Sequence, residues 1–304
     1  MKRMFASTAE PAPVASRFDW KLIASLAAVY LIWSSTYLAM KIAMVDLPPL
    51  LMASMRFASA GLVLLMVARH RGVAWPTRRD WLSVAPVGTL LFVGGNGFIA
   101  IAQGTIPSGA TAVVAAMMPL WMAVLAVISG ERPSRREWMS LVIGFGGILV
   151  LMGGPSLAGD PLHIVLVLLA PAAWALGSII ARRLNTPATK DVFMLSAMEM
   201  ITGGVSLLVI GALRGENIPD HVGAESWIAL AYLWLAGSLV AFTAYSWLLR
   251  NTRPVVATSY AYVNPSLAVV LGAVLAGEPL GATTIVANLL MVVAIYLALS
   301  KHRA

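Results

Sequence analysis

The chain has 304 residues, of which 60% are hydrophobic and 11% charged, and its mean hydropathy is +0.84. Soluble domains are about one quarter charged, so this composition excludes an ordinary water-facing globule and predicts that lipid covers the excess apolar surface. The net charge of +8 does not indicate nucleic-acid binding, because the basic residues lie in short turns between apolar runs.

The pattern of apolar runs predicts an all-α membrane protein with ten transmembrane helices. We expect residues 1–19, which are polar and rich in Pro and Ala, to form a disordered cytoplasmic tail. Each run that follows is close to the ~20 residues that a helix needs to cross the hydrocarbon layer. In chain order the predicted spans are 21–44, 48–68, 81–102, 107–128, 137–154, 161–182, 191–213, 226–249, 254–276 and 280–300. The first span is too long for a signal peptide, so we expect it to be retained.

Positive charges predict the orientation of these spans. Of the 21 Lys and Arg residues, 18 lie in the two termini and in alternate connections, near 69–79, 132–136, 182–190 and 250–253. The opposite connections hold only Arg214, while Lys41 and Arg56 fall within spans. By the positive-inside rule, both termini are expected in the cytoplasm.

Weak internal matches indicate a duplication of five helices. Trp33 matches Trp174 at an offset of 141 residues, Arg56 matches Glu199 at 143, and Thr111 matches Thr258 at 147. Five is an odd number, so the second copy enters the membrane upside down. The sequence thus predicts repeat 1 over 20–155 and repeat 2 over 160–300. Inverted repeats are typical of secondary transporters, whose binding site lies at the repeat interface near mid-membrane.

Four motifs resemble the EamA-domain proteins of the drug/metabolite transporter superfamily. They are IWSSTYLAMKIAM (32–44), MRFASAGLVLL (55–65), GNGFIAIAQGTIPSGATAVVAAMMPLW (95–121) and SWLLRNTRPVVATSYAYVNPSLAVVLG (246–272). Within the superfamily the chain resembles the YedA-type drug/metabolite exporters. The resemblance implies ten helices, two inverted five-helix EamA repeats, and a central cavity open to one side at a time. It also implies export of small metabolites, with amino acids as a common substrate class.

The stretch TSYAYVNPSLAVV (258–270) carries unusually many polar groups for a membrane helix. Tyr262 lies on one helical face with Thr258, and Asn264 lies on a neighbouring face with Tyr260. Pro265 breaks the backbone hydrogen bonding and is a candidate helix break. Such groups are tolerated at membrane depth where they line a cavity. The alternative is that they bond to neighbouring helices and hold the bundle together.

Further cavity candidates come from other spans. Trp33 and Trp174 lie well inside their spans, so an interfacial aromatic belt fits them poorly, and either cavity walls or core packing explains them. Pro119 on the fourth span loosely mirrors Pro265, and paired proline interruptions point to a transport site. The remaining cavity candidates are Thr36, Tyr37, Asn96, Gln103, Trp121, Ser178 and Tyr245.

Two ionisable residues within spans are candidates for ion coupling. Arg56 lies two turns into the second span, and Glu199 lies at a similar depth in the seventh. An intramembrane ionisable group is a functional hypothesis, and Glu199 is the candidate to titrate in a proton-coupled cycle. The alternative is that both bond to backbone ends or water near the interface.

Enzyme and ATPase functions find no support in the sequence. The four His residues lie at loops or span ends, and neither H-E-x-x-H nor G-x-S-x-G occurs. No Walker A motif is present, so we expect no ATP, and the lack of cysteine excludes cysteine-ligated metal. We therefore predict no cofactor and no bound metal.

The sequence favours an exporter of small metabolites, meaning amino acids, related amphipathic compounds or drugs, in a bacterial inner membrane. Its expected partners are the solute and the lipid bilayer, with no nucleic acid, and a monomer is compatible with this architecture. The alternatives are an importer or exchanger of similar solutes, or a non-transporting scaffold or receptor. The residues do not identify the solute, the direction or the coupling ion.

Overall fold

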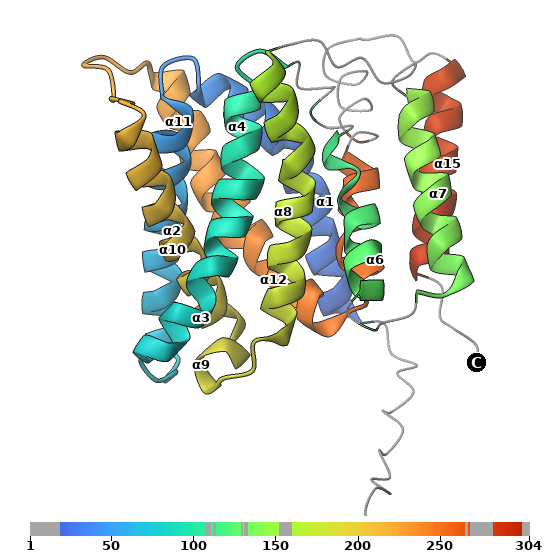
Figure 1. Cartoon of the computed structure of the whole chain (residues 1–304), viewed down its shortest axis with the longest axis horizontal. Coiled ribbons are helices and arrows are strands. Elements are labelled where there is room, and N and C mark those ends of the chain that lie inside the picture. Colours follow the sequence, from blue (N-terminus) through green and yellow to red (C-terminus); the bar gives the residue numbers. More distant parts are fainter. Residues whose placement is uncertain are drawn as a thin grey trace, which may run out of the picture.

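The computed structural model describes residues 19–106, 111, 114–128, 130, 133–151, 160–264, 267 and 282–299. All regular secondary structure among these residues is helical (Figure 1). The predicted tail therefore lies outside the described residues, except for Asp19. The side chain of Asp19 accepts hydrogen bonds from the backbone of Lys21 and Leu22 and so caps the first helix.

The first half of the chain forms α1 (Trp20–Ala43), α2 (Pro49–His70), α3 (Arg78–Gly88), η1 (Thr89–Gly97), α4 (Phe98–Ala102), α6 (Met118–Ile128) and α7 (Arg135–Leu151). The second half forms α8 (Pro161–Arg183), α9 (Pro187–Lys190), α10 (Val192–Leu213), α11 (Ala224–Tyr232), η2 (Leu233–Phe242), α12 (Thr243–Asn251), α13 (Pro254–Ala257) and α15 (Ala282–Leu299).

Six continuous helices in the described part of the chain are long and apolar enough to cross a membrane. They are α1, α2, the run from α3 through α4, α8, α10, and the run from α11 through α12. These six coincide with six of the ten predicted spans. The described helical parts of the other four segments, α6, α7, α13 and α15, do not meet the same length and hydropathy criteria. A count of ten helices therefore remains a prediction.

Helices from the two halves of the sequence pack side by side. α2 lies against α10, and α7 lies against α15 at one side of the bundle (Figure 1). Small residues bring α2 and α10 together: a Cβ added to Gly204 would lie 2.6 Å from the backbone nitrogen of Ala58. Close backbone approach through small residues is the usual way in which membrane helices associate.

Two segments depart from α-helical winding. η1 and η2 are π-helical and each forms the middle of a long membrane-crossing helix. Leu233, where η2 begins, follows Thr89, where η1 begins, by 144 residues, within the range of offsets seen in the sequence repeat. π-helical winding re-aims the side chains that follow it and is frequent at functional sites.

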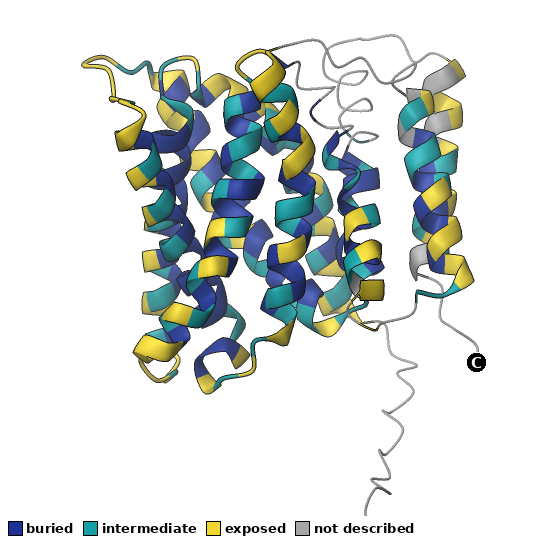
Figure 2. Ribbon diagram, viewed as in Figure 1, coloured by how far each residue is buried: buried dark blue, intermediate teal, exposed yellow. Residues whose placement is uncertain are grey.

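Burial divides the molecule into an apolar interior and an apolar outer surface. Dark blue residues in Figure 2 fill the region between α1, α2, η1, α8 and α12, where Phe57, Phe92 and Tyr245 are almost fully buried. Large aliphatic side chains such as Leu62 and Leu289 are exposed on the outer faces of their helices. An exposed apolar surface of this extent requires lipid rather than water as its solvent.

Candidate functional site

A central cavity lies between helices of both sequence halves, and the space there that is not filled by atoms is about 840 Å³ with its solvent-open part included. Its walls come from α1, α2, η1, α4, α6, α8, η2 and the helical residues after α13. The cavity extends from the middle of the bundle toward the end where α1 finishes and α2 begins. We refer to the opposite end, where α1 begins and α2 finishes, as the basic end.

The basic end carries the positively charged connections 69–79, 182–190 and 250–253, and the cavity lies in the other half of the bundle. We call the opposite end, where α2, α8 and α11 begin, the far end.

Six of the eleven predicted cavity residues line this cavity, together with Arg56. The lining residues that the sequence singled out are Trp33, Thr36, Tyr37, Arg56, Asn96, Trp174 and Asn264. Arg56 was a candidate for ion coupling rather than for the wall. The structure thus brings together residues that are up to 231 positions apart in the sequence, between Trp33 and Asn264.

Aromatic rings form one wall of the cavity. The ring of Trp33 meets the rings of Tyr260 and Trp174 edge-to-face, with centroids 4.8 and 5.7 Å away. The indole nitrogen of Trp33 donates a hydrogen bond to the carbonyl oxygen of Gly237 in η2, over 3.2 Å. Edge-to-face packing and this bond fix the orientation of the Trp33 ring.

Two predicted residues, Ser178 and Tyr245, are absent from the lining and support Trp174 instead. The Trp174 indole nitrogen donates to the Tyr245 hydroxyl over 3.1 Å, and that hydroxyl lies 2.8 Å from the Ser178 hydroxyl. Tyr245 is 1% exposed and Ser178 is fully buried. These side chains therefore position a cavity wall without lining the cavity.

The other candidates lie elsewhere. Trp121 is 36% exposed and does not line the central cavity, and Tyr262 packs against Gly144 of α7. Gln103 is at the end of α4, and Glu199 is 1% exposed within α10. Pro119 lines a second pocket near the basic end. Pro265 is outside the described residues.

Sequence reasoning omitted several residues that line the cavity, of which Tyr260 is the most informative. Its position four residues before Asn264 places both side chains on one helical face. This spacing was visible in the sequence, yet Tyr262 was selected in its place. Phe57, Met118 and Phe242 also line the cavity, but buried apolar residues carry no sequence signal that separates a cavity wall from ordinary core.

Arg56 is a buried cation in the cavity wall. Its side chain is contributed by α2 and the residue is 5% exposed. The guanidinium Nε donates to the Ser238 hydroxyl over 2.7 Å, and Cζ lies 4.4 Å from the centroid of the Phe57 ring. Both contacts hold the guanidinium in place, the second as a cation–π interaction.

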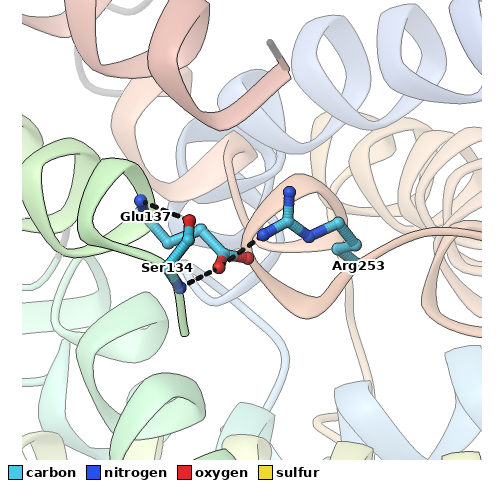
Figure 3. Close-up of polar contacts among 3 residues, drawn as sticks. All are labelled: Ser134, Glu137 and Arg253. Atoms are coloured by element: carbon cyan, nitrogen blue, oxygen red, sulfur yellow. Dashed lines mark hydrogen bonds and ion pairs between the residues drawn. The ribbon is translucent and has the colours of Figure 1, made fainter. Parts of the chain in front are cut away.

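Contacts join the two sequence halves at the basic end. The Tyr30 hydroxyl of α1 lies 2.6 Å from the hydroxyl of Ser259, in the turn after α13. Arg253, just before α13, forms an ion pair with Glu137 of α7 (Figure 3). Glu137 also accepts a hydrogen bond from the backbone nitrogen of Ser134, so one carboxylate caps α7 and joins it to the second half.

The sequence profile described as the EamA-like transporter family matches residues 20–153 and 161–300. The chain belongs to the EamA-like transporter family. It is therefore a membrane transporter of this family, within the drug/metabolite transporter superfamily.

Named relatives agree with this assignment. The chain is 39% identical to the uncharacterized inner membrane transporter YedA of Escherichia coli strain K12, over 85% of this chain and 84% of that protein. It is 27% identical to the uncharacterized transporter YvbV of Bacillus subtilis, over 92% of each chain. It is 25% identical to the protein PecM of Dickeya dadantii, over 79% of this chain and 80% of PecM.

A solved structure shares the fold of this EamA-family chain. A crystal structure matches with a TM-score of 0.75, covering 93% of this chain and 97% of the other, at 21% sequence identity. At this identity the likeness concerns the fold alone. Among the described residues, no group of three or more His, Asp or Glu side chains is placed to hold a metal ion.

Proposed function

We propose that this chain is a secondary transporter of a bacterial inner membrane that exports small amphipathic metabolites, such as amino acids, related compounds or drugs. It works by alternating access through the central cavity, between two inverted five-helix repeats with ten spans in all. Both termini face the cytoplasm. Import or exchange of the same solutes uses the same cavity and is separated from export by experiment.

The observation that carries the proposal is a cavity whose walls come from both halves of the sequence. Trp33 and Asn96 belong to the first half, and Trp174 and Asn264 belong to the second. A solute held between two halves that rock against each other is exposed to each side in turn. A wall of aromatic faces with a few polar groups suits a solute that has an apolar body and polar ends.

The polar groups of the wall support solute binding. Among the described residues, no hydrogen-bond partner reaches Oδ1 of Asn264, although the residue is 5% exposed. A buried amide oxygen without a partner costs about 1–3 kcal/mol. A solute donor in the cavity offsets this cost.

Transport is tested with purified protein in liposomes that are loaded with labelled amino acids. We expect efflux above that of empty liposomes, and a reduction of roughly 10-fold or more for Trp33→Ala, because the substitution removes a ring of the wall. Tyr296→Ala is the matched control, since Tyr296 is 71% exposed on α15. Efflux that equals the background for every solute tested would favour a non-transporting scaffold or receptor.

The cavity itself is tested by labelling, because the chain has no native cysteine. We expect Asn264→Cys to react with a small water-soluble thiol reagent, and transported solute to protect it. Labelling that never occurs at position 264 would contradict the assigned cavity.

Proton coupling is tested with a second variant. Glu199→Gln should remove the response of transport to a pH gradient while solute exchange persists.

A further inference from the structure

The cavity of the proposed transporter carries a positive charge without a matching carboxylate. Arg56 lines the cavity, and no Asp or Glu is found among the described residues that line it. Among the described residues, Arg253 forms an ion pair with Glu137 at the basic end, away from this cavity. Burying a cation costs several kcal/mol unless an anion or several hydrogen bonds compensate it.

The fixed contacts of Arg56 leave most of its hydrogen-bonding capacity unused. A guanidinium has five N–H donors, and the described contact to the Ser238 hydroxyl occupies Nε. Gly237, which also lines the cavity, packs closely beside one terminal nitrogen: a Cβ added there would lie 3.0 Å from Nη2, so only a glycine lets the guanidinium take this position. The free edge of the guanidinium is the fork that binds carboxylates in two parallel hydrogen bonds.

Among the described residues, the rest of the wall offers no carboxylate to an ammonium group, and its unpaired acceptor, Oδ1 of Asn264, is a neutral oxygen that a single amide N–H of the solute satisfies. The carbonyl oxygen of Gly237 already accepts from Trp33. The Trp33 ring is engaged edge-to-face with Tyr260 and Trp174. Arg56 is the charged side chain among the described residues that line the cavity. Lys41, also in the first two spans, is exposed and lies outside the lining.

We propose that Arg56 anchors the carboxylate of the transported solute, and that this solute is a monoanion with an aromatic or other apolar body and no free ammonium group. N-acylated amino acids and aromatic acids have this chemistry. The inference rests on the proposed function and narrows its substrate class. The carboxylate binds at the guanidinium fork, and the apolar body lies against Trp33 and Phe57.

Four phenylalanine derivatives that share one side chain and differ in the charge of their end groups test this preference. N-acetyl-phenylalanine is an anion at neutral pH, phenylalanine a zwitterion, N-acetyl-phenylalaninamide neutral, and phenylalaninamide a cation. We expect calorimetric titration of the purified protein to give the anion an affinity roughly 10- to 100-fold above that of the neutral amide, as a charge-assisted bidentate contact provides. The zwitterion and the cation should bind more weakly than the anion.

Variants assign the preference to Arg56. Arg56→Gln should abolish the preference for the anion and keep the affinity for the neutral amide, while Arg56→Lys should retain part of it, because lysine supplies the charge without the fork. Arg214→Gln is the matched control, since Arg214 is exposed in a far-end connection. The ranking of the four probes in the wild type tests the proposal even if Arg56→Gln fails to fold.

The outcomes separate this inference from the proposed function. Equal affinities for the anion and the neutral amide, no binding of the anion, or an anion preference that survives in Arg56→Gln would each overturn the anchor. The proposed function is decided separately, by efflux of any solute from liposomes. Efflux without an anion preference leaves a transporter with a different substrate class.

Discussion

At the scale of single residues, the side chains behind the cavity wall matter as much as those that line it. Tyr245→Phe removes the hydroxyl that accepts from Trp174 and bonds to Ser178. A lost hydrogen bond of this kind costs about 0.5–1.5 kcal/mol, so we expect the KM of transport to rise roughly 2- to 10-fold. Initial efflux rates at several solute concentrations measure it. Tyr296→Phe is the control, and an unchanged KM would show that Trp174 keeps its position unaided.

Asp46, in the connection between α1 and α2, provides a prediction about pH. Its carboxylate accepts from the Ser226 hydroxyl over 2.7 Å and from the Gly223 backbone nitrogen over 2.9 Å. These hydrogen bonds lower the pKa of Asp46 below its ordinary value of 3.8. A lowered pKa stabilises the folded state above the unfolded-state pKa, and this stabilisation is lost as the pH falls through the folded-state pKa.

We therefore expect wild type to melt at a higher temperature than Asp46→Asn at every pH above about 4. The difference between the two melting temperatures should shrink as the pH is lowered below that value. Thermal unfolding in detergent, followed by tryptophan fluorescence between about pH 3 and pH 7, measures both. A difference that grows on acidification would contradict the assigned hydrogen bonds.

At the scale of helices, the glycines of η1 allow α8 to approach the cavity. A Cβ added to Gly95 would lie 2.5 Å from Cε3 of Trp174, which is too close for two carbon atoms. The Trp174 ring or the whole of α8 must move in Gly95→Ala, and overpacking of this kind costs about 1–3 kcal/mol. We expect slower efflux and a lower melting temperature.

Gly146 on α7 supplies the matched control for this substitution. Nothing lies within 4 Å of a Cβ added there, so Gly146→Ala should leave efflux unchanged and be neutral or slightly stabilising. The same assays apply to both variants. Equal behaviour of the two would show that Gly95 is not needed for the contact between η1 and α8.

The positions of the membrane-crossing helices were more predictable from the sequence than the helical face that lines the cavity. Six predicted spans coincide with helices of sufficient length, because about 20 apolar residues are needed for each crossing. Of the two residues after α13 that the sequence indicated, Asn264 lines the cavity and Tyr262 does not, whereas Tyr260, which was not selected, does. Periodicity gives the relative angle between residues but not which face points inward. The turn at Thr258 and Ser259, which ends α13, changes the helical phase and has no clear sequence signal.

The role of Arg56 was also beyond periodicity. Its depth, two turns into a span, was compatible with a position near the interface. The cavity extends from mid-bundle toward the far end, where α2 begins, so the same depth places the guanidinium in the wall. The position of a cavity along a bundle depends on how helices from both halves pack, and one sequence does not encode that directly.

At the scale of the whole molecule, contacts at the basic end join the two sequence halves. In the proposed alternating-access cycle these contacts close that end, and opening it requires the Tyr30–Ser259 hydrogen bond and the Arg253–Glu137 ion pair to separate. Arg253→Gln is the cleaner probe of the ion pair, because Glu137 remains available to the Ser134 backbone nitrogen that it accepts from. Alternating access predicts that weakening this closure favours the state open at the basic end.

We expect Arg253→Gln to raise the labelling rate of Ala257→Cys by a reagent applied from the basic end, because Ala257 is only 1% exposed and takes part in neither contact. The Arg253 side chain is 42% exposed, and ion pairs screened to this extent are weak, so the increase should be roughly 1.5- to 5-fold. Arg78→Gln removes a charge at the same end without touching the pair and should leave the rate unchanged. A rate that is equal in all three proteins would mean that the Tyr30–Ser259 contact and the surrounding packing keep this end closed, with the ion pair serving only to fix α7 against the second half.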